Sequence, residues 1–243
     1  MTDQYDVIGA LYERGKLVPV GLAERGTLFA ALPDLAGRSV LDAGCGTGFY
    51  ARMFAARGAA RVVGIDASIE MITYARRVEE REPLGITYEQ FDGAELPVLG
   101  SFDVVTAVWL LGYAPGVEAL DFMVGKLVAN LAPGATFVVL VPNPEFDWDN
   151  ADILPAYGIS ARRTEESAGR QGYAVHIPGD PPVDFEGFSW PPGVIEPALE
   201  RAGLTDVRRV PTTITEDLVA EHGEQYWAPL RANPTFAIFT ATR

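Results

Sequence analysis

The sequence predicts a doubly wound α/β fold, and three observations lead to this prediction. Short apolar segments alternate with helical patterns through roughly the first 140 residues, which is typical of repeated βα units around a parallel sheet. A glycine-rich turn at 44–48 directly follows the first apolar segment. The alternation then ends near Pro142, and residues 143–191 are rich in proline, glycine and charge. That segment is too long for a plain loop in a compact domain and indicates an insertion.

The elements of the alternating part follow from apolar spacing and from helix start and stop signals. Ser68 is a plausible N-cap, Gly58 ends one helix, and Pro133-Gly134 ends another. We expect strands at 39–43, 61–66, 86–91, 102–109 and 135–141, and helices at 49–57, 69–81 and 117–131.

The remainder of the chain predicts a hairpin and a short closing unit. Residues 173–177 and 183–188 alternate apolar and polar residues around a Pro-Gly-Asp-Pro-Pro turn, which favours an antiparallel hairpin. A helix at 194–202 must carry Pro197 in its first turn or be kinked by it. Two further strands are expected at 206–210 and 235–240.

Composition restricts the partners and the compartment. Acidic side chains outnumber basic ones 33 to 19, giving a net charge of −14, and the longest basic clusters are pairs. Nucleic acid and anionic membrane are therefore disfavoured as partners. No apolar stretch approaches the ~18 residues that span a bilayer, and the N-terminus lacks a secretory pattern. With Cys45 as the single cysteine, we expect a cytoplasmic protein without disulfides.

The glycine turn predicts a ligand that is positively charged where it meets the first strand. Gly44, Gly46 and Gly48 allow close backbone approach at a helix N-terminus, but their spacing differs from the dinucleotide fingerprint G-x-G-x-x-G. Asp42 precedes the first glycine by two positions. A carboxylate there repels a pyrophosphate and suits an ammonium or sulfonium group.

Several ordered segments resemble the class I S-adenosylmethionine (SAM)-dependent methyltransferases. The sequence VLDAGCGTG at 40–48 resembles motif I of that family, and VVGIDAS at 62–68 resembles its second strand, with Asp66 as the terminal acid. Further matches are QFDG at 90–93, FDVV at 102–105 and LAPGA at 131–135, where Ala135 replaces the usual second glycine; 199–210 resembles the sixth-strand junction.

The resemblance implies a seven-stranded, mostly parallel sheet with the last strand antiparallel, in a single domain over 1–243. It implies SAM as cofactor, with S-adenosylhomocysteine as product. It also implies that Asp66 accepts hydrogen bonds from the ribose hydroxyls and that Asp92 lies near the adenine amino group. The expected cofactor-binding residues are Tyr5, Asp42, Gly44, Gly46, Asp66, Ala67, Met71, Asp92, Gly93 and Trp109.

Two segments are expected to cover the site. Residues 1–36 form an N-terminal lid in which Tyr5, Ile8, Leu11 and Tyr12 share one helical face. The 143–191 insertion emerges at the carboxyl edge of the sheet, where ligands of open α/β sheets bind. The expected substrate-binding residues are Tyr12, Tyr113, His176, Glu186 and Trp190. Methyl transfer needs a base only when the acceptor must lose a proton, so the catalytic residue stays open, with Tyr5, Tyr113 and His176 as candidates.

The predicted activity is methyl transfer to an N, O or C atom of a small molecule, for which we consider aromatic and heterocyclic acceptors, by a monomer or homodimer. Asn143-Pro144-Glu145-Phe146 follows the fifth strand, whereas the N-P-P-[YF] motif of amino-methyltransferases follows the fourth, so we interpret it as a turn. No metal-ligand cluster is evident. The alternatives are a SAM-binding protein that is non-catalytic or transfers no methyl group, and an NAD(P)-dependent reductase, which the glycine spacing and the missing Tyr-x-x-x-Lys pattern disfavour.

Overall fold

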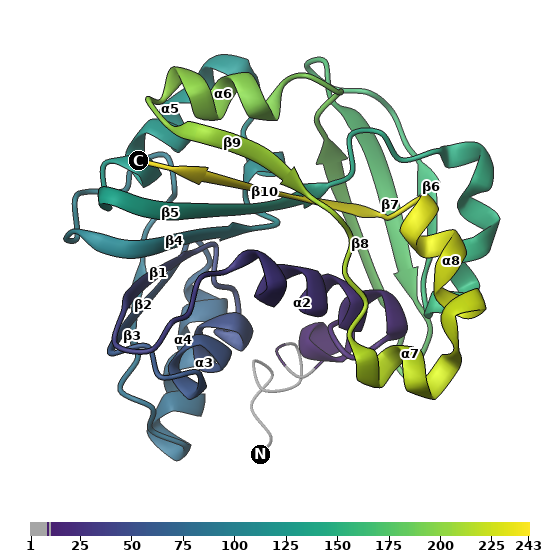
Figure 1. Ribbon diagram of the computed structural model, residues 1–243, viewed down its shortest axis with the longest axis horizontal. Coiled ribbons are helices and arrows are strands. Elements are labelled where there is room, and N and C mark those ends of the chain that lie inside the picture. Colours follow the sequence, from purple (N-terminus) through teal and green to yellow (C-terminus); the bar gives the residue numbers. More distant parts are fainter. Residues whose placement is uncertain (1–8, 10) are drawn as a thin grey trace.

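A seven-stranded sheet forms the centre of the protein, as the computed structural model of Gly9 and residues 11–243 shows (Figure 1). Its strand order is β3-β2-β1-β4-β5-β10-β9. The last strand, β10, runs antiparallel to both of its neighbours, β5 and β9, which confirms the predicted sheet. The strands are β1 Ser39–Ala43, β2 Arg61–Asp66, β3 Thr87–Gln90, β4 Phe102–Val108, β5 Leu131–Pro142, β9 Thr205–Val210 and β10 Phe236–Thr242.

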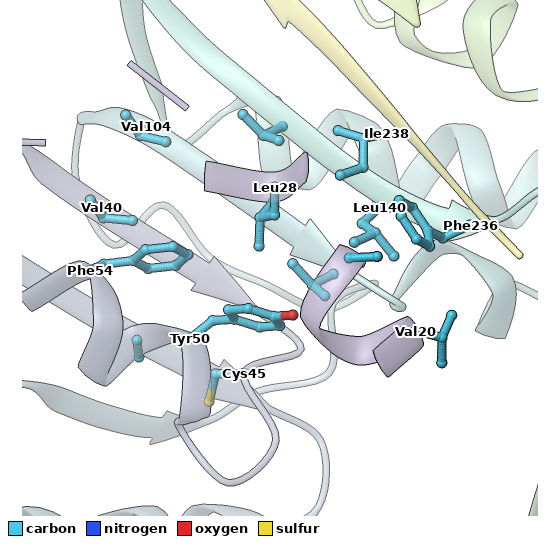
Figure 2. Close-up of a cluster of buried hydrophobic side chains, with 14 of the residues drawn as sticks. Val20, Leu28, Val40, Cys45, Tyr50, Phe54, Val104, Leu140, Phe236 and Ile238 are labelled. Carbon is cyan, nitrogen blue, oxygen red and sulfur yellow. The ribbon is translucent and has the colours of Figure 1, made fainter. Parts of the chain in front are cut away.

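Helices cover both faces of this sheet. In Figure 1, α2, α3 and α4 lie on one face, and α5 and α6 lie on the other. The helices are α2 Pro19–Ala31, α3 Phe49–Ala56, α4 Ile69–Arg81, α5 Val117–Val128, α6 Ile195–Arg201, α7 Glu216–His222 and α8 Glu224–Ala232. Each face has its own apolar cluster. Figure 2 shows the cluster between α2, α3 and the sheet, which includes Leu28, Val40, Phe54 and Ile238.

The point where the strand order reverses lies between β1 and β4. β1 pairs in parallel with β2 on one side and with β4 on the other. Asp42 lies opposite Thr106 in the second of these pairings. In open α/β sheets the crevice at such a switch point is where ligands bind, so the topology directs attention to the carboxyl end of β1.

A separate three-stranded antiparallel sheet follows β5. It has the order β6-β7-β8, with β6 Ser160–Arg163, β7 Gln171–Ile177 and β8 Val183–Ser189. The predicted hairpin is therefore confirmed as β7 and β8. The third strand, β6, and the preceding 3₁₀ segment η2, Trp148–Tyr157, were not expected from the sequence.

Several boundaries differ from the predicted ones. Helix α5 ends at Val128, and β5 begins at Leu131, where Leu131 pairs with Phe102 before the register shifts. Pro133-Gly134 thus lies within an irregular strand start. Ser68 caps α4 by accepting a hydrogen bond from the Met71 backbone, and Pro197 lies in the first turn of α6, both as predicted.

Helices α7 and α8 were not expected, and α2 lies within the predicted helical lid segment, 1–36, for which no helix at 19–31 was predicted. Helix α2 carries Arg25, Gly26 and Glu24 among its apolar residues, which weakens its apolar period. Helices α7 and α8 have fewer than ten residues each and become stable by burying Leu218, Trp227 and Leu230. None of the helices within residues 11–243 is long and apolar enough to cross a bilayer.

Candidate active site

The glycine turn connects β1 to α3 and is fastened to the end of β2. Gly44 and Cys45 both donate backbone hydrogen bonds, each 2.8 Å, to the carbonyl oxygen of Ile65. The Gly46 N–H donates to Asp66 Oδ2 at 2.9 Å. Gly46 has a φ of 53°, a left-handed conformation that favours glycine. The turn therefore brings the ends of two adjacent strands to one place.

Asp42 is an acid buried beneath this turn. Its side chain belongs to a residue that is only 1% exposed, and its Oδ1 accepts a hydrogen bond of 2.7 Å from Thr106 Oγ1. Its other oxygen, Oδ2, is buried and has no hydrogen-bond partner among the residues that the structure describes. Burial, partly offset by the Thr106 hydrogen bond, raises the pKa of Asp42 to about 7. The site thus holds an acceptor that a cationic ligand group would satisfy.

Asp66, at the end of β2, is held in a fixed orientation by backbone donors. In addition to the Gly46 bond, its Oδ1 accepts a 2.9 Å hydrogen bond from the Ser68 N–H. Partial burial raises the pKa of Asp66, and these backbone donors work in the opposite direction. Each oxygen retains accepting capacity, so the carboxylate is oriented and still able to bind a ligand.

The other residues expected at the cofactor lie around these two acids. Ala67 follows Asp66, and Met71 is half-buried in the first turn of α4. Asp92 is exposed after β3 and accepts a hydrogen bond from the Ala94 N–H, and Gly93 is buried. Tyr5 and Ile8 lie outside the described residues.

A lysine that was not predicted lies among aromatic rings close to the turn. Lys16 Nζ is between 5.3 and 5.9 Å from the ring centres of Tyr12, Tyr50 and Trp109. Glu24 on α2 accepts hydrogen bonds from Lys16 Nζ at 2.9 Å and from the Tyr50 hydroxyl at 2.6 Å. Burial opposes the charge of Lys16, but Glu24 outweighs it and raises the pKa of the ammonium group.

This cluster connects the glycine turn to a cavity. A side chain on Gly46 would come within 3.7 Å of the Tyr12 ring, and Tyr12, Lys16 and Trp109 also line the cavity. Trp109 follows β4 with a φ of 60°, which is unusual for a tryptophan. Lys16 lies in the turn that precedes α2, and its partners Tyr50 and Trp109 come from distant parts of the chain, so no local pattern would have found it.

The cavity has a volume of about 420 Å³ and lies between the main sheet and the three-stranded sheet. Apolar and aromatic groups dominate its lining, and only a few charged residues take part, as is usual for small-molecule sites. Its aromatic lining residues are Tyr12, Trp109, Tyr113, Phe146, Trp148, Tyr173, Phe185 and Phe188.

The structure brings three of the five expected substrate residues to this cavity. Tyr12 and Tyr113 line it, and so does Glu186, although Glu186 is exposed at its rim. Arg170 and Tyr173 also line it and were missed, because the tract around them has no period that assigns its side chains to a face.

His176 and Trp190 do not line the cavity, which corrects their expected positions. In β7 the side chains of Val175 and Ile177 face inward, so His176 faces outward and contacts Asp184 at 2.8 Å. Trp190 is 2% exposed and belongs to the apolar cluster beneath α5 and α6, where its Nε1 donates to the Leu111 carbonyl. No group of three or more potential metal ligands occurs among the residues that the structure describes.

Fold and site together define a doubly wound protein with a ligand site at the switch point and an adjoining aromatic cavity. Comparison with known families is consistent with this: residues 40–134 match the model of a methyltransferase domain. A solved S-adenosylmethionine-dependent methyltransferase from Mesorhizobium loti superposes with a TM-score of 0.62 and 25% identity, covering 91% of this chain and 98% of that one.

Curated relatives match only part of the chain. A magnesium-protoporphyrin O-methyltransferase of Rhodobacter capsulatus is 36% identical over 124 residues, which are 47% of this chain and 54% of the relative. An uncharacterized protein of Haemophilus influenzae is 30% identical over 149 residues, 55% of either chain. The chain therefore spans about half the length of the curated relatives it matches. The similarity to a methyltransferase domain thus covers residues 40–134, and the chain as a whole superposes on a solved SAM-dependent methyltransferase.

Proposed function

We propose that the protein transfers a methyl group from SAM to an N, O or C atom of a small molecule held in the aromatic cavity. The observation that carries this proposal is the unpartnered Oδ2 of buried Asp42 at the switch point. The amino group of the methionine portion of SAM is a cation that would satisfy this oxygen. When bound, SAM supplies a methyl group on a sulfonium, which is already activated for displacement.

The residues around the glycine turn fit this cofactor by their chemistry. Asp66, held by two backbone donors, offers its remaining lone pairs to a pair of ribose hydroxyls. Ala67 and Met71 at the start of α4, and Asp92 and Gly93 after β3, would surround the adenine. Gly44 and Gly46 leave room for the ligand, Trp109 would face it from β4, and Tyr5 would cover it from the lid segment, 1–36.

The cavity would contribute by positioning the acceptor and excluding water. Holding nucleophile and methyl group in line accounts for much of the acceleration in such a displacement. Tyr12 and Tyr113 are the proposed substrate contacts, whereas Glu186 lies at the rim on the outward face of the small sheet. Tyr113 is the proposed proton acceptor where the nucleophile must lose a proton. The proposal treats 1–243 as one domain in which the 143–191 insertion supplies the acceptor side.

Calorimetry with SAM and S-adenosylhomocysteine tests the proposal. We expect micromolar binding by the wild type and a loss of roughly tenfold or more in Asp66→Ala, the effect of removing a charge-assisted hydrogen bond. Asp152→Ala, an exposed acid in η2, is the matched control and should bind like the wild type. A metabolite screen for methyl transfer then follows. A folded wild type that binds neither compound contradicts the proposal, and binding without turnover on any acceptor favours a non-methylating SAM protein.

A further inference from the structure

Arg170 is a buried cation that no acid in the described chain neutralises. The residue is 5% exposed and lines the cavity. Its Nη1 donates a hydrogen bond of 2.9 Å to the carbonyl oxygen of Gly112, but its Nε is buried without a partner within Gly9 and residues 11–243. A buried guanidinium without a counter-charge destabilises the folded protein. A bound anionic ligand would offset that cost.

Two aromatic rings fix the orientation of the Arg170 guanidinium. Its Cζ lies 4.3 Å from the ring centre of Phe188 and 5.6 Å from that of Trp190. Since Nη1 is occupied by Gly112 and Nε is buried, Nη2 is the donor that remains for a ligand, and no hydrogen bond from it to the described residues occurs. A charged N–H donor of this kind suits an oxygen of a carboxylate.

The other charges at the cavity do not meet this need. Glu24 is engaged by Lys16 and Tyr50. Glu186 lies opposite Ala174 in β7, on the exposed face that also carries His176 and Asp184, and forms no ion pair with a described residue. Arg170 is thus the cation of the described cavity lining that is left for a ligand.

We infer that Arg170 binds a carboxylate on the methyl acceptor, and that the acceptor is a flat, apolar or aromatic acid. The aromatic lining contributed by Trp109, Tyr113, Tyr173 and Phe185 suits the body of such a molecule, and a volume of about 420 Å³ accommodates one of modest size. The inference rests on the proposed function for the identity of the cavity as the acceptor site, and it makes Arg170 a specificity-determining residue.

Binding of matched acids and amides tests the inference without requiring turnover. The probes are 2-naphthoate with 2-naphthamide and 4-hydroxybenzoate with 4-hydroxybenzamide, titrated calorimetrically into the full chain with and without S-adenosylhomocysteine. In the wild type we expect at least one acid to bind about tenfold or more tightly than its amide. Equal affinity within both pairs, or failure of both acids to bind at millimolar concentration, overturns the inference.

Variants test whether Arg170 is responsible for the preference for acids over amides. Arg170→Gln should weaken acid binding about tenfold or more and leave amide binding within about threefold, and Arg170→Lys should retain part of the preference because it keeps the charge. Arg162→Gln, an exposed arginine of β6 in the same small sheet, is the control for loss of one charge. An undiminished acid preference in Arg170→Gln overturns the inference. If that variant does not fold, the wild-type ratio and Arg170→Lys decide.

The two proposals fail separately. Retained acid preference in a protein that does not bind S-adenosylhomocysteine would contradict the methyltransferase proposal and leave the anion site. Cofactor binding and turnover of neutral acceptors, without any acid preference, would contradict only the role of Arg170.

Discussion

The glycine-turn region and the three-stranded sheet contribute to neighbouring parts of the candidate active site, but they are built in different ways. The backbone of the turn is held over a short sequence distance, as when the Gly46 N–H reaches Asp66 twenty positions away. The cavity walls join residues from before α2, from the 3₁₀ segment η1, Leu111–Tyr113, and from β7 and β8, as when Arg170 reaches the Gly112 carbonyl across 58 positions. The first region depends on backbone geometry, and the second depends on tertiary packing.

This difference determines what a change in each region should do. In the turn, conformation and buried charge are fixed together, so substitutions there should alter stability and cofactor binding at once. In the small sheet, alternate residues of a strand face the cavity and solvent, so neighbouring substitutions should differ sharply in effect. Measurements of stability and of ligand binding can therefore distinguish the two regions.

The largest effect should come from the buried acid of the turn. The pKa of Asp42 is raised to about 7 in the folded protein, against about 3.9 in an unfolded chain. Its stabilising contribution is therefore complete below about pH 4 and is lost as the pH rises through 7. We expect Asp42→Asn to gain stability relative to the wild type, on the order of 4 kcal/mol, between pH 4 and pH 8. Urea denaturation at both pH values measures this difference.

The titration of Asp42 should also change the affinity for ligand: stability falls as the pH rises, whereas affinity should increase. An ammonium group beside Asp42 favours the carboxylate, so the affinity of the wild type for S-adenosylhomocysteine should rise with pH up to about 7. Asp42→Asn should bind weakly with a flatter pH profile. A variant whose stability tracks the wild type at both pH values would show that Asp42 is ionised throughout the range.

A smaller effect is expected from the backbone of the turn at Gly48. This residue has a φ of 78°, and a Cβ there would lie 2.4 Å from the Tyr88 hydroxyl oxygen. The Tyr88 ring cannot easily withdraw, because it also packs against Gly64. Gly48→Ala should therefore lower the free energy of unfolding by about 2 kcal/mol through strain and overpacking together.

Gly203→Ala separates the two causes in the Gly48 experiment. Gly203 has a φ of 86° and open space around its Cβ position, so its substitution should cost about 1 kcal/mol from backbone strain alone. Chemical denaturation of both variants measures the difference. Equal losses at the two glycines would mean that Tyr88 moves aside freely.

The comparison also explains what the sequence could predict. The positions of Asp42, Asp66 and the glycines follow from a local pattern, because the strand, turn and helix that carry them are consecutive. Arg170 and Lys16 gain their surroundings only when distant segments meet, so no local pattern identifies them. Trp190 was misplaced for a different reason. An aromatic residue in an insertion can also pack into the core, and Trp190 does so here, where it donates a hydrogen bond to Leu111. The period of β7 and β8 was apparent, but which face meets the cavity depends on how the small sheet packs.

The smallest effect should come from the outward face of that sheet, at His176. Its contact with Asp184 joins two exposed side chains, and exposed pairs of this kind contribute between about 0 and 1 kcal/mol to stability. His176→Ala should therefore change the free energy of unfolding by less than about 0.5 kcal/mol and ligand affinity by less than about twofold. Asp184→Ala removes the same pair and should have an equally small effect, which makes it the matched control. If His176→Ala instead reduced acceptor binding or turnover about tenfold while Asp184→Ala did not, the histidine would contact the substrate, and the assignment of the two faces of β7 would have to be reversed.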